Sequence, residues 1–210
     1  GNMVVVRAGG AVGGLGAIEL STWTIDVTAG SNINLENRSG GTTTVRNLET
    51  AGAVTYLKTL GGSENVERVR GSNININIVG ASASLAVGDV VGTGTVTLAA
   101  GAAVNELGAD AGVDVMAGGL LAISAGTAIG ATGALEIAAG ALSLIASNGL
   151  LAVDNTWSSG SVNAAAIRST NGDLAFTQRG GSNLNVTAGS STKNGSFTVL
   201  NGASLWLNSI

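Results

Sequence analysis

The sequence predicts an all-β protein: a parallel β-solenoid with about 20–22 residues per turn. Apolar residues alternate with small or polar ones in short segments, which is typical of strands with one buried face. These segments are clearest between residues 118 and 153, where glycines separate them. Leu121 and Leu142 are 21 residues apart, and so are Ile123 and Leu144. A fixed interval filled with short strands indicates a coil that stacks on itself.

The composition is consistent with such a coil. Glycine accounts for 34 of the 210 residues, and charged residues make up only 10%, against about a quarter in an average protein. Proline is absent, so nothing interrupts backbone pairing. Cysteine and histidine are also absent, which excludes a disulfide framework and most zinc sites. We therefore expect stability to come from backbone ladders and packed aliphatic rows.

Several functional classes are disfavoured by charge and residue content. Net charge is −4, and nine scattered Lys and Arg do not form the basic stripe that nucleic-acid binding needs. Residues 133–153 are long and apolar enough to span a bilayer. However, they alternate and contain Glu136 and Asn148, so no membrane-spanning segment is predicted. A serine nucleophile would lack its histidine base, and no enzyme is expected.

Strands can be placed along the chain in order. The first are expected at 3–6, 18–20 and 23–27, joined by Gly, Ser, Thr, Asn and Asp, which tolerate sharp turns. Later apolar alternations predict strands at 96–98, 113–115, 121–123, 135–137, 142–144, 151–153, 172–176, 195–199 and 203–207. Alanine favours helix, but glycine every six to nine residues opposes it at ~1 kcal/mol each. The alternation therefore favours strands.

A second repeat marks three of these strands. Ser-Asn-Ile-Asn-Leu at 31–35 recurs as Ser-Asn-Ile-Asn-Ile at 72–76 and as Ser-Asn-Leu-Asn-Val at 182–186. The intervals of 41 and 110 residues correspond to about two and five turns. Alternation directs the aliphatic side chains inward and the asparagines outward. We expect the asparagine amides to bond to copies of themselves in neighbouring turns.

Residues 40–71 are the least regular part of the single predicted domain, which spans 1–210. They carry much of the charge, together with Tyr56. A solvated insertion or a hairpin that projects from the coil is the first interpretation. The alternative is a contact patch for a partner, since insertions in repeat proteins often bind. Its candidate residues are Tyr56, Lys58, Arg68 and Arg70.

Two further features have both a structural and a functional interpretation. Trp157 lies in a turn-like segment, where it either fills a corner of the coil or stacks on a sugar ring as a fifth partner-binding candidate. Asp110 and Asp114, with Glu106 nearby, resemble one unit of the calcium-binding nonapeptides of β-rolls. The tandem repetition of that motif is missing, so solvated turn carboxylates are expected. No catalytic, cofactor-binding or metal-binding residues are predicted, and no cofactor is expected.

The units at 133–137, 140–144 and 172–176 are similar to the G-x-L-x-[LIV] repeats of filamentous haemagglutinin-like proteins. These are large bacterial exoproteins exported by two-partner secretion or autotransport. The similarity covers most of the chain except 40–71 and corresponds to the family's shaft, without its secretion domain or membrane barrel. It implies a right-handed parallel β-helix, an extracellular location and an adhesive or fibre-forming role. No catalytic or cofactor residues are carried over.

The sequence thus favours a structural protein: an extracellular shaft of a bacterial surface adhesin, or a filament subunit, secreted or held at the cell surface. Neither end of the chain has a predicted cap, and open strand edges pair readily. The expected partners are therefore neighbouring solenoid turns, or copies of the chain stacked end to end. The alternative is a β-helical module that binds or cleaves carbohydrate, with surface glycans as partners. Cleavage would require convergent carboxylates in a groove.

Overall fold

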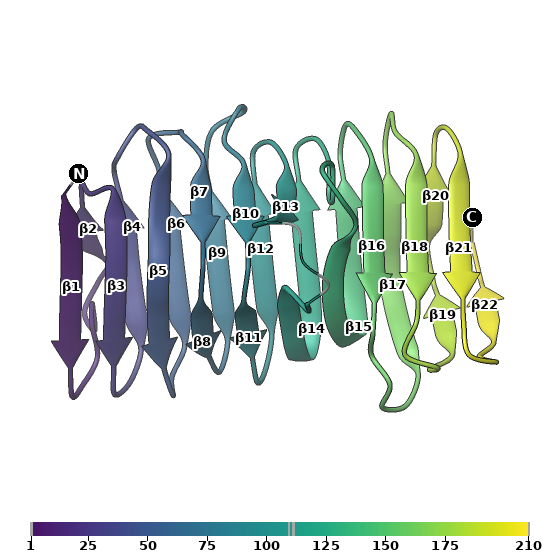
Figure 1. Cartoon of the computed structure of the whole chain (residues 1–210), viewed down its shortest axis with the longest axis horizontal. Coiled ribbons are helices and arrows are strands. Elements are labelled where there is room, and N and C mark those ends of the chain that lie inside the picture. Colours follow the sequence, from purple (N-terminus) through teal and green to yellow (C-terminus); the bar gives the residue numbers. More distant parts are fainter. Residues whose placement is uncertain (1, 109, 111, 210) are drawn as a thin grey trace.

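The computed structural model describes residues 2–108, 110 and 112–209, and these residues form strands and turns without a helix. The strands wind into one parallel coil of about ten turns, a β-solenoid (Figure 1). The strands are β1 (Met3–Ala8), β2 (Ile18–Leu20), β3 (Thr24–Ala29), β4 (Ile33–Asn37), β5 (Thr43–Thr50), β6 (Val54–Lys58), β7 (Glu64–Val66), β8 (Val69–Gly71), β9 (Ile74–Ile78), β10 (Leu85–Val87), β11 (Val90–Gly92), β12 (Val96–Ala100), β13 (Val104–Glu106), β14 (Val115–Ala125), β15 (Leu135–Ala146), β16 (Leu151–Asn155), β17 (Val162–Ser169), β18 (Leu174–Gln178), β19 (Leu184–Val186), β20 (Gly189–Ser191), β21 (Gly195–Val199) and β22 (Leu205–Leu207).

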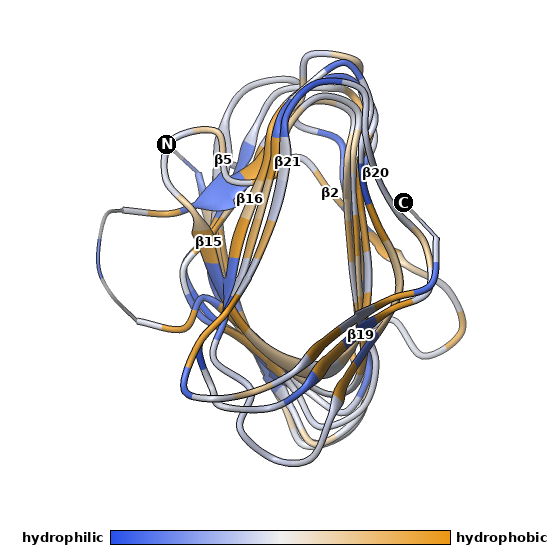
Figure 2. Cartoon of the chain, turned by 90° about the vertical axis from the view of Figure 1, so that its right-hand side faces the viewer, coloured by the Kyte–Doolittle hydropathy of each residue, from blue (hydrophilic) through white to orange (hydrophobic). Residues whose placement is uncertain are grey.

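The strands form two long parallel rows. One row begins with β1, β3 and β5 and then divides, because the next two laps bend, the first between β7 and β8 and the second between β10 and β11. The other row runs through β2, β4, β6, β9 and β12. The long strands β14 and β15 turn a corner, so that each of them belongs to both rows. The first row continues through β16, β18 and β21. The second row continues through β17, β19 and β22. Viewed along its axis, the coil encloses a narrow interior that side chains fill (Figure 2).

The predicted register is confirmed. Leu121 pairs with Leu142, and Ile123 pairs with Leu144, in the adjacent parallel strands β14 and β15. The first two asparagine repeats are two laps apart, because Ile33 pairs with Val54 and Val54 with Ile74. Lap length is therefore nearly constant in these regions, which keeps inward positions stacked above inward positions.

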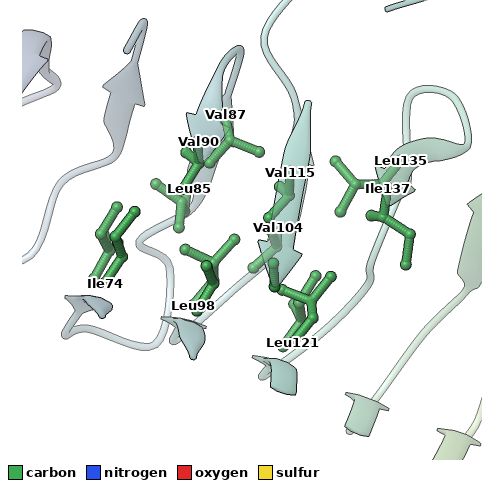
Figure 3. Close-up of a cluster of buried hydrophobic side chains, with 14 of the residues drawn as sticks. Ile74, Leu85, Val87, Val90, Leu98, Val104, Val115, Leu121, Leu135 and Ile137 are labelled. Carbon is green, nitrogen blue, oxygen red and sulfur yellow. The ribbon is translucent and has the colours of Figure 1, made fainter. Parts of the chain in front are cut away.

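The core is one continuous aliphatic stack along the coil. Alternation turns every second strand residue inward, so that β9 has the buried residues Ile74, Ile76 and Ile78 and exposed asparagines between them. Val90, Val115 and Ile137 lie one above the next in three successive laps (Figure 3). At ~25 cal/mol per Å² of apolar surface, such rows are the main source of stability.

The structure corrects the expectation for residues 40–71. They form β5, β6, β7 and β8, which pair in parallel with the laps before and after them. The stretch is therefore part of the coil and neither an insertion nor a projecting hairpin. Its apolar pattern is irregular because several inward positions carry polar side chains that bond to one another inside the coil.

The asparagine repeats work differently from the predicted amide-to-amide ladders. The first asparagine of each repeat, Asn32, Asn73 or Asn183, accepts a hydrogen bond at its side-chain oxygen from a backbone N–H of the next lap, each at 2.9 Å. Among these strands the one amide pair is Asn185 with Asn163, at 2.9 Å. The repeated motif thus fixes the spacing of successive laps at a corner by side-chain-to-backbone bonds.

Residues at the two ends of the coil are more exposed than those within it. The inward positions of β1 and β21 are only partly buried, since each of these strands has a neighbour on one side alone. Trp206 of β22 is 49% exposed. Among the residues described, there is no helix of the length and apolarity needed to cross a membrane.

Candidate functional site

A cluster of five polar side chains lies inside the coil, and we refer to it as the buried polar cluster. Its members are Asn37 at the end of β4, Thr43 at the start of β5, Tyr56 and Lys58 of β6, and Glu64 at the start of β7. Each is no more than 1% exposed. Strand alternation places them there: β6 reads Val-Thr-Tyr-Leu-Lys, so Tyr56 and Lys58 share the inward face with Val54.

Glu64 and Thr43 connect the members of the buried polar cluster. Oε2 of Glu64 accepts hydrogen bonds from the Thr43 hydroxyl (2.5 Å) and the Tyr56 hydroxyl (2.7 Å), and lies 3.5 Å from Nζ of Lys58. The Lys58 amine donates to the Thr43 hydroxyl (2.6 Å) and to the carbonyl oxygen of Gly41 (2.8 Å). The other carboxylate oxygen of Glu64, Oε1, has no hydrogen-bond partner.

Burial changes the acid–base properties of this cluster. It lowers the pKa of the Lys58 amine and raises the pKa of the Glu64 carboxyl, although each group partly offsets the shift of the other. Burial also raises the pKa of Tyr56. In a dry interior the charged forms are disfavoured, so the neutral amine and the neutral acid become accessible. The cluster thus brings together a nucleophile and a proton carrier.

The carboxamide of Asn37 completes the arrangement. Its Oδ1 accepts hydrogen bonds from the backbone N–H groups of Thr22 (3.4 Å) and Ser39 (3.2 Å). Its Nδ2 donates to the Thr22 carbonyl (3.2 Å), the Tyr56 hydroxyl (3.3 Å) and the Thr43 hydroxyl (3.5 Å). Two N–H donors on a carbonyl oxygen polarise the C=O bond and stabilise negative charge on that oxygen.

These positions separate the five residues that the sequence suggested for partner binding. Tyr56 and Lys58 are enclosed by the coil, so the prediction that they contact a partner is wrong for the structure described. Arg68 and Arg70 lie on the outside, where Arg68 pairs with Glu49 at 3.0 Å and Arg70 pairs with Asp89. Each of these ion pairs joins successive laps, and exposed pairs of this kind contribute little stability.

Trp157 lies apart from the other four residues. Its side chain is partly buried and packs against the core, and its indole N–H bonds to the carbonyl of Ser159 at 2.5 Å. The ring also covers Gly140, where an added Cβ would lie 2.8 Å from Nε1. The indole therefore fills a corner of the coil, which is the structural interpretation of this residue.

Three acidic groups converge at another point of the coil. Carboxylate oxygens of Glu106, Asp114 and Glu136 lie within 4.8 Å of one another. The Asp114 side chain is buried and accepts a hydrogen bond from the backbone N–H of Glu136 at 3.1 Å. Burial and the two neighbouring glutamates raise the pKa of Asp114 to about 7. The group can share a proton or hold a divalent cation, for which carboxylates are suitable ligands.

The sequence interpretation found only part of these two groups. It placed Glu106 with Asp114 but not Glu136, which is one lap of 22 residues beyond Asp114. Asp110 instead lies in the exposed turn, where its backbone N–H bonds to Glu106 at 2.8 Å. Asn37, Thr43 and Glu64 were also missed. The signal available for them was the inward position of Lys58 in an alternating strand, since a buried cation requires partners.

Comparisons of the chain with protein-family models, with curated proteins and with solved structures found no match.

Proposed function

We propose that this chain is a structural β-helical shaft, without catalytic activity, of a bacterial surface adhesin or of an extracellular filament. The observation that carries the proposal is the parallel pairing, which continues lap upon lap from β1 to β22. About ten turns at ~4.8 Å each give a rod of roughly 50 Å. Such a rod resists bending because each lap hydrogen-bonds the next along the whole axis.

The outer surface supports a spacer role. Ion pairs on this surface, such as Arg7 with Asp26 and Arg38 with Glu19, join successive laps. Their charges are therefore neutralised by partners in the same chain. What remains is mostly Ser, Thr, Asn, Ala and Gly. The similarity of the glycine-leucine units to filamentous haemagglutinin-like shafts supports the same role, and the proposal includes the extracellular location that this similarity implies.

The open edges of β1 and β22 are suited to end-to-end pairing with another copy or with further laps of the same chain. Electron microscopy of the purified protein tests the proposal directly. We expect straight rods whose length follows the number of laps, alone or joined into fibres with an axial repeat of one chain. Globular or flexible particles would contradict a shaft.

A glycan array separates the shaft from the carbohydrate module. For a shaft we expect no bound glycan. Specific glycan binding that Trp23→Ala abolishes and Trp157→Ala preserves would favour the module instead, because Trp23 is 48% exposed whereas Trp157 packs against the core.

A further inference from the structure

We propose that Lys58 and Asn37 form an intramolecular isopeptide bond between Nζ of the lysine and Cγ of the asparagine, with loss of ammonia and with Glu64 as the proton carrier. The proposal rests on the geometry of the buried polar cluster and is independent of the shaft function. It assigns a covalent modification to side chains that would otherwise be an expensive buried ion pair.

The first requirement is proximity. Asn37 and Lys58 are register partners in the adjacent parallel strands β4 and β6, so their backbones are ~4.8 Å apart. Both side chains point inward and both are fully buried. The Lys58 amine and the Asn37 amide nitrogen also bond to the same atom, the Thr43 hydroxyl oxygen. Bond formation then requires a change in the lysine side-chain torsions that carries the amine from the Thr43 hydroxyl to the amide beside it.

The second requirement is a reactive nucleophile and electrophile. An ammonium ion has no lone pair to attack with, and burial lowers the pKa of Lys58 toward the neutral amine. On the other side, the N–H groups of Thr22 and Ser39 already bond to Oδ1 of Asn37. They are placed to stabilise the negative charge that develops on this oxygen when the amine adds to Cγ.

The third requirement is proton transfer. The Glu64 carboxylate lies 3.5 Å from the lysine amine. It is also connected to the amide nitrogen of Asn37, because the Tyr56 and Thr43 hydroxyls bond to both groups. The Nζ–Cγ bond forms as the neutral amine adds to Cγ, and the protonated Glu64 donates its proton to Nδ2 through these hydroxyls. The Cγ–Nδ2 bond breaks, ammonia leaves, and Glu64 takes up one proton from Nζ, which restores its protonated form. Atoms and charge balance without any oxidant, cofactor or metal ion.

The coil contains an internal control for this reaction. Asn155 is also fully buried, and its Oδ1 accepts from the N–H groups of Ala139 (3.2 Å) and Trp157 (3.4 Å). Its register partner in the next lap is Gln178, which has no nucleophilic amine. The same amide environment is therefore present without the chemistry, so cross-linking is expected at Asn37 and not at Asn155.

Intact-mass spectrometry of the denatured wild-type protein tests the proposal. We expect a mass below that of the sequence by one ammonia. Tryptic digestion should leave the bond after Lys58 uncut and yield a branched peptide in which residues 8–38 are joined to residues 47–68. Lys58→Arg and Glu64→Gln should have their full sequence masses, Asn37→Asp should lose one water instead, and Asn155→Ala should keep the ammonia loss.

The wild-type result alone decides, so variants that fail to fold do not leave the question open. A full sequence mass together with cleavage after Lys58 would overturn the proposal. Loss of ammonia without the branched peptide would also overturn it, since this indicates cyclisation at another asparagine. Loss of water with the cross-link confined to residues 47–68 would assign the bond to Lys58 and Glu64 and would equally overturn it.

Discussion

Asn37 and Asn155 lie in different laps and make the same set of backbone hydrogen bonds. In each, Oδ1 accepts from the N–H two residues further on and from an N–H of a neighbouring segment, and Nδ2 donates to the carbonyl of that segment. They differ in the residue stacked on them by register, which is Lys58 for Asn37 and Gln178 for Asn155. The same hydrogen-bonded asparagine therefore has a lysine amine as its neighbour at Asn37 and an unreactive glutamine amide as its neighbour at Asn155.

The role of such a corner amide in stability can be measured at Asn155. Asn155→Ala removes the partners of the buried N–H and C=O of Ala139, and also the donor to Gln178, which bonds at 2.9 Å. We expect a loss of about 1–3 kcal/mol per group left unsatisfied, measured by chemical denaturation. Asn163→Ala, at an exposed position, is the matched control and should cost less than about 1 kcal/mol. Equal losses of unfolding free energy in the two variants would show that the hydrogen bonds of Asn155 stabilise the protein no more than those of an exposed asparagine.

The facing of side chains in the coil can be tested at two adjacent residues of β15. Leu142 is fully buried, whereas Ser143 points outward. Leu142→Asp places a carboxylate in a dry aliphatic row and should destabilise the protein by at least about 4 kcal/mol. Ser143→Asp should change the free energy of unfolding by less than about 1 kcal/mol. Thermal melts compare the two variants, and similar melting temperatures would refute the assigned facing.

Stacked glycines set the distance between laps at one turn. An added Cβ on Gly101 would lie 2.0 Å from the carbonyl oxygen of Gly80 in the lap before it. Because that neighbour is backbone, relief requires the laps to separate. We expect Gly101→Ala to cost about 1–3 kcal/mol in unfolding free energy. Gly10→Ala is the control, since nothing lies within 4 Å of its added Cβ. An unchanged melting temperature for Gly101→Ala would mean that this turn is free to shift.

The parts of the fold that follow from periodicity were predictable from sequence. The interval between Leu121 and Leu142 gave the correct register because the inward positions between these two residues are apolar. The third asparagine repeat was less predictable. Val186, not Leu184, falls in the column of Ile74, since the laps between them differ in length: Val96 and its register partner Leu121 are 25 residues apart, whereas Leu121 and Leu142 are 21 apart. An offset of two residues leaves the same side chains pointing inward, so the alternation of apolar and polar residues cannot reveal the offset.

The buried polar cluster escaped prediction for a different physical reason. Lys58 and Glu64 interrupt the apolar pattern, and on their own such residues indicate exposure. Their burial is tolerable only because Thr43, Tyr56 and Asn37 supply partners from two adjacent laps. These partners become neighbours only once the lap length is known to within a residue. The same limit applied to Glu136, which meets Asp114 one lap earlier.

The acidic group should make stability depend on pH. The pKa of Asp114 is about 7 in the folded protein against 3.8 for the free side chain, chiefly through burial, and burial also raises the pKa of Glu136. A folded-state pKa above the unfolded value means that the folded protein holds the proton more tightly. The resulting stability is fully present below about pH 4 and is lost as pH rises through 7.

We therefore expect the free energy of unfolding of the wild type to fall between pH 4 and pH 8, with Asp114 contributing about 2–4 kcal/mol. Asp114→Asn should remove this part of the slope, because an asparagine oxygen can still accept the N–H of Glu136 and carries no charge. Glu64 shifts in the same direction, so the difference between variant and wild type is the quantity to measure. Asp110→Asn, in the exposed turn of the same loop, should keep the wild-type slope. If Asp114→Asn followed the wild-type curve at every pH, the carboxyl of Asp114 would titrate normally and its burial would be wrong.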